Sequence, residues 1–190
     1  GTYQVASSLQ LNKTLTIQSE DQANKAIISY TGAAKTPAFE MNPNGLLTLK
    51  NIYLKGTKSQ YAFASLKENM SSLYNLTLQD CEVSEFDFVL KGYKYSFSEF
   101  LKFYSTTFKN CNNGIELSEE RDDKGDYNAE NIIIDNCTFD GVDANVLDYY
   151  RGGYDESTVG GNLLVTKSRF TNCGAKEKNG VLLNTYGIIN

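Results

Sequence analysis

The feature that most constrains this chain is a short apolar-x-apolar unit that returns along almost its whole length. The unit occurs at residues 15–17, 47–49, 76–78, 101–103, 132–134, 163–165 and 188–189, with first members 25 to 32 residues apart. A period of that length indicates a repeat protein, in which each unit buries its apolar face against its neighbours. The spacing is too irregular for leucine-rich repeats, and no helical periodicity accompanies it.

Residues at equivalent positions of the repeats have similar character and form columns. The columns are seen when the five central units are aligned on Leu49, Leu78, Phe103, Ile134 and Val165. Two positions further on, every unit has a polar residue that fits a corner: Asn51, Asp80, Ser105, Asn136 and Lys167. Five positions on lies an apolar column: Leu54, Val83, Phe108, Phe139 and Phe170. Residues 131–141 are the clearest copy of this strand, corner and second strand.

A second set of short apolar segments follows each corner, at residues 39–41, 63–65, 88–90, 115–117, 146–148 and 181–183. Each repeat therefore holds about three short strands. This pattern predicts one all-β domain over residues 1–190: a single-stranded right-handed parallel β-helix of the pectin-lyase type, with about six coils. An antiparallel β-sandwich is the alternative, and it would not explain the columns.

The four cysteines fall into two further columns, Cys81 with Cys137 three positions after the aligned residue and Cys111 with Cys173 eight positions after it, and one repeat separates the members of each pair. Strands stack about 4.8 Å apart, so like cysteines are roughly 9–10 Å apart, beyond disulfide reach. We therefore expect free, buried thiols.

Composition removes several classes of function. The chain contains no histidine, which excludes Ser-His-Asp and Cys-His nucleophilic sites and histidine-ligated zinc. The net charge of −5 argues against nucleic acid and anionic membranes as partners. No apolar run is long enough to span a membrane.

The loop at residues 149–161 departs most from the repeat and is the main candidate for a binding site. Tyrosine rings can stack on sugar rings, arginine can hold a carboxylate, and acidic side chains can bind hydroxyl groups or a hard cation. The candidate residues are Tyr149, Tyr150, Arg151, Tyr154, Asp155 and Glu156, with Asp148 beside them. The alternative is a simple turn in which Arg151 pairs locally with Asp148 or Glu156.

Two other insertions interrupt the repeat, and insertions from one corner of a solenoid gather on one face. The insertion at residues 91–100 is basic and aromatic; Lys91 and Tyr93 suit an anionic glycan, together with Lys94 and Tyr95. The alternative there is a solvated turn with buried Phe97 and Phe100. The insertion at 119–126 carries Asp122, Asp123 and Asp126, whose spacing fits a solvated charge run better than a calcium loop.

Neither end of the chain carries a recognisable cap. No amphipathic helix precedes Leu15, and residues 188–190 begin another coil. Because solenoid ends need covering, we expect a segment of a larger protein or a chain that meets a partner at its ends.

The motifs resemble polysaccharide lyase family 6, which includes chondroitinase B and alginate lyases. The resemblance rests on the coil pattern at 132–139 (Ile-x-Ile-x-Asn-Cys-x-Phe) and on segments 148–158 and 168–174. It is closest to the C-terminal β-helix domain of two-domain alginate lyases. It implies a bacterial protein of the periplasm or the extracellular space, in which a catalytic domain of the same chain or a second subunit is the partner.

The same resemblance implies chemistry on acidic polysaccharides such as alginate. Family members cleave uronate polymers by β-elimination, with a lysine base, an arginine acid and usually calcium. Their catalytic arginine stands in an Arg-His-Gly run, whereas the comparable place here reads Asn-Thr-Tyr-Gly at 184–187. The resemblance therefore assigns no catalytic residue or metal ligand to this chain, and calcium enters only as a cofactor of the family.

Three functional hypotheses follow. The first is a non-catalytic β-helix domain that supports or extends an acidic-polysaccharide-binding surface. The second is a lyase in its own right, in which Arg151 and Lys91 act near Glu116 and Asp148. The third is a structural or adhesive β-helix without a sugar ligand.

Overall fold

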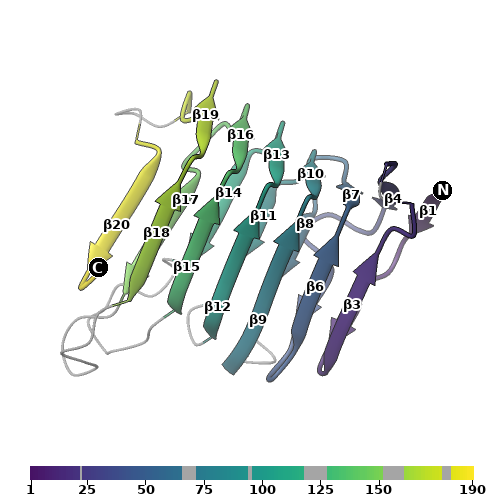
Figure 1. Ribbon diagram of the computed structural model, residues 1–190, viewed down its shortest axis with the longest axis horizontal. Coiled ribbons are helices and arrows are strands. Elements are labelled where there is room, and N and C mark those ends of the chain that lie inside the picture. The colour runs from purple at the N-terminus through teal and green to yellow at the C-terminus, as the bar shows by residue number, and fades with distance from the viewer. Residues whose placement is uncertain (22, 66–71, 94–95, 118–127, 152–160, 177–180) are drawn as a thin grey trace.

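The chain winds into a solenoid of short parallel strands (Figure 1). The computed structural model describes residues 1–21, 23–65, 72–93, 96–117, 128–151, 161–176 and 181–190. All named secondary structure in these residues is β-strand. They include no helix long and apolar enough to cross a membrane.

Three parallel sheets run along the solenoid, and successive strands of the chain belong to sheets A, B and C in turn. Sheet A contains β1 (Thr2–Val5), β4 (Ala26–Tyr30), β7 (Ile52–Lys55), β10 (Glu82–Ser84), β13 (Thr107–Lys109), β16 (Thr138–Asp140) and β19 (Arg169–Thr171). Sheet B contains β2 (Leu9–Leu11), β5 (Pro37–Met41), β8 (Tyr61–Ala64), β11 (Phe88–Lys91), β14 (Asn113–Leu117), β17 (Leu147–Arg151) and β20 (Leu183–Gly187). Sheet C contains β3 (Thr14–Gln18), β6 (Leu46–Lys50), β9 (Ser72–Gln79), β12 (Phe97–Tyr104), β15 (Ala129–Asp135) and β18 (Asn162–Thr166). The predicted parallel β-helix is thus confirmed.

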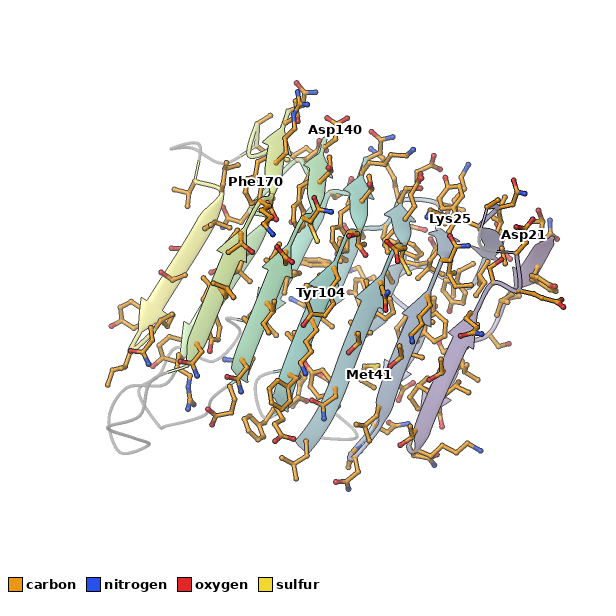
Figure 2. The ribbon with its side chains drawn as sticks, in the orientation of Figure 1. Asp21, Lys25, Met41, Tyr104, Asp140 and Phe170 are labelled. Carbon is orange, nitrogen blue, oxygen red and sulfur yellow. The ribbon has the colours of Figure 1, made fainter. Side chains whose placement is uncertain are left out.

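The register of sheet C reproduces the columns read from the sequence. Leu49 pairs with Leu78, Leu78 with Phe103, Phe103 with Ile134, and Ile134 with Val165. In sheet A the apolar column is also in register from Leu54 to Phe170. Phe108 and Phe139 stack with ring centroids 4.6 Å apart, and Phe139 and Phe170 at 5.3 Å. Figure 2 labels Phe170 near the C-terminal end of this stack.

The polar corner between sheets C and A has a backbone conformation that explains its composition. All five corner residues have φ between 46° and 55°: Asn51, Asp80, Ser105, Asn136 and Lys167. This left-handed region costs most side chains energy, and Asn and Asp tolerate it best. Near the N-terminal end, the Lys25 ammonium donates to Asn51 Oδ1 at 3.2 Å and so links neighbouring coils; Figure 2 shows Lys25 close to Asp21.

The cysteines are free, as expected. Cys81, Cys111 and Cys137 are buried, whereas Cys173 is half-buried. Burial raises the pKa of Cys111 and of Cys137 to about 11, so few of these thiols are ionised at neutral pH. They serve as small core residues, which donate weakly to backbone carbonyls.

Other details of the repeat differ from the prediction. The first coil begins with β1 and β2, ahead of the first expected strand at residues 15–17, and β4 was not anticipated. In sheet B, Phe63 pairs with Leu90 and Ile115 pairs with Leu147, so the expected segments are shifted by one or two residues. At the last coil Ile189 bridges to Gly161, and Ile188 is not aligned with Leu163. Variable turn lengths cause these shifts, because a turn can change length without disturbing the next strand.

Each of the three insertions lies between a strand of sheet B and the next strand of sheet C. They follow β11, β14 and β17 and precede β12, β15 and β18, so all leave the solenoid at the same corner. The first is shorter than expected: Phe97 and Phe100 belong to β12, and both are half-exposed instead of buried. Residues 118–127, with Asp122, Asp123 and Asp126, lie outside the described residues.

Candidate functional site

A row of polar side chains crosses the outer face of sheet B. Successive residues of a strand point to opposite faces, and Leu90, Ile115 and Leu147 are buried in the core. The next residue in each strand therefore points outward. Register places Lys91 beside Glu116, Glu116 beside Asp148, and Asp148 beside Asn184. We call these four residues the sheet B row.

Contacts between neighbouring coils hold the row together. The Lys91 ammonium forms an ion pair with Glu116 and lies 4.8 Å from the centre of the Phe88 ring. The Asn184 amide donates to Asp148 Oδ1 at 2.9 Å. A hollow of about 40 Å³ adjoins the row, and it is lined by Phe88, Asn113, Gly114, Ile115, Glu116, Ala144, Asn145 and Asp148. The row thus offers a cation, carboxylates and an amide on one surface.

An aromatic pair continues this face beyond Asp148 and Asn184. Tyr150 and Tyr186 lie two residues further along β17 and β20 and are paired in register. Their rings stack with centroids 5.2 Å apart and planes 21° apart. Tyr150 is fully buried, but Tyr186 is 56% exposed. The outer face therefore combines hydrogen-bonding groups with one accessible ring.

Tyr149 and Arg151 alternate with these residues, and their side chains are on the inner side of β17. The Tyr149 hydroxyl donates to the Ala129 carbonyl at 2.6 Å, and burial raises the pKa of Tyr149. The Arg151 side chain is only 3% exposed and pairs with Glu130 at 3.1 Å. A Cβ at Gly161 would collide with the Tyr149 hydroxyl, which explains the glycine at this position.

The structure separates the candidates that the sequence grouped together. Lys91 and Asp148 share the outer face, whereas Tyr149 and Arg151 do not join them there. Arg151 pairs with Glu130, which the sequence-based alternatives did not include. The Tyr93 backbone N–H donates to Ser65 Oγ at 2.9 Å. Tyr154, Asp155, Glu156, Lys94 and Tyr95 lie outside the described residues.

The sequence does not indicate Asn184 and Tyr186 as site residues. They lie in segment 184–187, which stands where the lyase family has its Arg-His-Gly run but lacks the arginine and the histidine. The available signal was the alternation of Asn184 and Tyr186 on one face of a strand. Asn184 and Tyr186 lie beside Asp148 and Tyr150 because β20 pairs with β17. The alignment expected from the sequence differs from this pairing by one residue.

Calcium, which the family resemblance implies, does not fit the described residues. They contain no group of three or more Asp, Glu, Cys or His side chains that could hold a metal ion. The two carboxylates of the sheet B row are Glu116 and Asp148, and Glu116 is engaged by Lys91. Calcium requires six to eight oxygen ligands, so these two carboxylates do not form a calcium site by themselves.

Comparisons with known proteins identify the fold. No family model matches the sequence, and no curated protein matches it significantly. Solved structures of the PL6 family alginate lyase AlyGC, and of a point mutant of it, match all of this chain with a TM-score of 0.82. The sequence identity is 24%, and this chain spans 28% of the length of those chains. The likeness shows that this chain has the β-helix fold of an alginate lyase from the family that its motifs resemble.

Proposed function

We propose that this chain is a non-catalytic β-helix domain that binds an acidic polysaccharide of the alginate type through the outer face of sheet B. The observation that carries the proposal is the sheet B row with Tyr186 beside it. Carbohydrate sites combine aromatic faces, which contact the sugar ring, with amides and carboxylates, which bind its hydroxyl groups. The fold shared with an alginate lyase supports a uronate polymer as the ligand.

The charges of the row specify how such a polymer would lie. A uronate carboxylate would approach the Lys91 ammonium, where a charge-assisted hydrogen bond is available. Its hydroxyl groups would donate to Asp148 and accept from Asn184. The carboxylates of Glu116 and Asp148 oppose a second anion nearby, so the row suits one carboxylate at Lys91 and hydroxyl groups further along.

Three observations favour binding over lyase activity. Lys91, the candidate base, is engaged in an ion pair with Glu116. Arg151, the candidate acid, is buried on the other side of the sheet and paired with Glu130. The chain also lacks histidine, so the Arg-His-Gly run of the family has no counterpart.

The biological setting follows from this proposal. A domain that binds alginate outside the cytoplasm would be periplasmic or secreted and would act beside a catalytic domain of the same polypeptide or of a second subunit. The binding domain would hold the polymer while the catalytic partner cleaves it. No chemical step is assigned to this chain.

The test is isothermal titration of alginate oligosaccharides into the 190-residue chain. Lys91→Met should weaken binding roughly tenfold, because one charge-assisted hydrogen bond is lost. Lys91→Arg should retain most of the affinity. Lys55→Met is the matched control, because Lys55 lies in β7 of sheet A and forms an exposed ion pair with Glu85. Raising the salt concentration should weaken the wild-type interaction and have less effect on Lys91→Met.

Each other outcome has a defined meaning. No binding to alginate or to other uronate polymers would contradict the proposal and favour a structural or adhesive β-helix. Equal binding of a neutral polysaccharide would contradict the acidic ligand. Formation of an unsaturated product, followed by its ultraviolet absorbance, would show that the chain is itself a lyase.

A further inference from the structure

We propose that the hollow beside Lys91 binds a free hydroxyl group of the uronate unit whose carboxylate lies at Lys91, so that this surface prefers sugars that are not acylated at that hydroxyl. The inference rests on the proposed function and adds a subsite that determines specificity. In sheet B, the strands β11, β14 and β17 around the hollow are flanked by β8 on one side and β20 on the other. Neither end of the solenoid therefore creates the hollow.

The size of the hollow excludes a sugar ring but admits one of its substituents. Its volume of about 40 Å³ has room for one or two water-sized groups. Gly114 lines it, and a Cβ at this position would collide with the Val146 carbonyl, so glycine lets two coils approach closely here. A hydroxyl group fits this space, whereas its acetyl ester, with two further carbons and an oxygen, does not.

One polar atom in the lining has no partner in the described part of the chain. The side-chain oxygen of Asn145 is buried, and no described residue donates a hydrogen bond to it. The backbone of Asn145 is fixed, because its carbonyl accepts from the Gly114 N–H at 3.0 Å. A buried acceptor without a donor costs folding free energy. A ligand group that donates to this oxygen removes that cost on binding.

The charges around the hollow favour a hydroxyl group over a carboxylate. Glu116 and Asp148 line the hollow together with Asn145, so they would repel a second anion. A sugar O–H can donate to the Asn145 oxygen without bringing a charge. The carboxylate of the sugar is therefore left to the Lys91 ammonium at the edge of the hollow.

Lys91 and Phe88 place the sugar unit at the mouth of the hollow. The Lys91 ammonium pairs with Glu116 and lies 4.8 Å from the centre of the Phe88 ring, and both of these residues line the hollow. The Phe88 ring is held by an edge-to-face contact with Tyr61, with centroids 5.5 Å apart. A carboxylate at Lys91 and a hydroxyl group in the hollow are close enough to belong to one sugar unit, whose C–H groups would contact Phe88.

The experiment is isothermal titration of two matched uronate oligosaccharides, one with free hydroxyl groups and one chemically O-acetylated. For the wild-type chain, acetylation should weaken binding roughly tenfold, because the hydrogen bond to Asn145 is lost. Asn145→Leu should weaken binding of the free oligosaccharide by a similar factor and should respond less to acetylation. The melting temperature of Asn145→Leu should equal or exceed that of the wild type, because the variant lacks the unpaired buried acceptor.

Phe88→Leu tests the contact with the sugar ring, and Phe100→Leu is its matched control. Phe100 is half-exposed on sheet C, with the Lys102 ammonium 4.1 Å from its ring centre, so both variants lose the same kind of contact. Phe88→Leu should weaken binding roughly three- to tenfold, and Phe100→Leu should not. Asn131→Leu, in β15 of sheet C, is the corresponding control for Asn145→Leu.

Failure of this inference can be told apart from failure of the proposed function. If the wild type binds both oligosaccharides equally, or if acetylation weakens the wild type and Asn145→Leu by the same factor, the hydroxyl subsite is wrong and the proposed function stands. The same holds if Asn145→Leu binds no more weakly than Asn131→Leu. If Phe88→Leu binds no more weakly than Phe100→Leu, the placement of the sugar unit is wrong.

Two further outcomes are decisive. A melting temperature of Asn145→Leu well below that of the wild type would overturn the assignment of an unpaired acceptor in the hollow. If the wild type binds no uronate oligosaccharide, both proposals are overturned. Thermal unfolding of each variant verifies that it is folded.

Discussion

The inner and outer faces of sheet B use the same strands in opposite ways. In β17, Tyr149 and Arg151 face inward and are buried against Ala129, Glu130 and Gly161. Asp148 and Tyr150 face outward, where they meet Asn184 and the exposed Tyr186. Both faces carry tyrosine and an ionisable side chain, so residue type alone does not separate structural from binding residues. The face of the strand and the exposure of the side chain together make that distinction, since Tyr150 faces outward but is fully buried.

The comparison is tested most strongly by two neighbouring residues of β14. Ile115→Ala should lower the free energy of unfolding by about 2–5 kcal/mol, because Ile115 is buried in the core and its truncation leaves a cavity. Glu116→Ala, on the outer face, should cost less than about 1 kcal/mol. Urea unfolding of both variants provides the measurement. Equal losses would show that the outer face is as important to stability as the core.

The two ion pairs provide a second contrast. Glu130→Gln should destabilise the chain by about 1–3 kcal/mol, because it weakens the pairing of a charge on Arg151 that is almost completely buried. Glu116→Gln should cost about 0–1 kcal/mol, since water still solvates the Lys91 ammonium, whose side chain is 27% exposed. Unfolding at low and high salt would distinguish the two. A larger loss for Glu116→Gln would contradict the assigned burial.

The smallest expected effect concerns the hydroxyl of Tyr149. At neutral pH, Tyr149→Phe should cost about 0.5–1.5 kcal/mol, the contribution of one hydrogen bond. Burial raises the pKa of Tyr149 in the folded state, so the neutral hydroxyl stabilises the fold fully below the unfolded pKa of about 10. That stability is lost as the pH rises through the folded pKa. The deficit of Tyr149→Phe should therefore shrink above pH ~10, and a constant deficit in unfolding curves would disprove the link.

The sequence predicted the architecture well because every coil of the solenoid must meet the same packing and backbone requirements. Each coil must supply inward apolar side chains and a corner residue that tolerates a left-handed backbone, so Phe139 and Asn136 have counterparts in neighbouring coils. Pairing in sheet C and in the later part of sheet A followed directly. The pairing of β17 with β20 did not follow, because it depends on turns of variable length that leave no periodic signal.

The candidate site was predicted only in part. Lys91 and Asp148 were proposed, and both lie on the outer face of sheet B. Tyr149 and Arg151 were proposed for the same surface but are buried, because strand alternation continues into β17 where a loop was expected. Asn184 and Tyr186 gain their place from β17, a strand more than thirty residues earlier in the chain.

The sequence alone therefore determined that this chain forms a parallel β-helix with free cysteines, three of them buried, since those properties follow from a local pattern that recurs from coil to coil. Tertiary structure decided which side chains share a surface. Whether a tyrosine points into the core or to the outer face of the sheet depends on strand register, and register is fixed by pairing between distant segments. One shifted residue reverses the face of a side chain, so the binding surface could be recognised only once the coils were stacked.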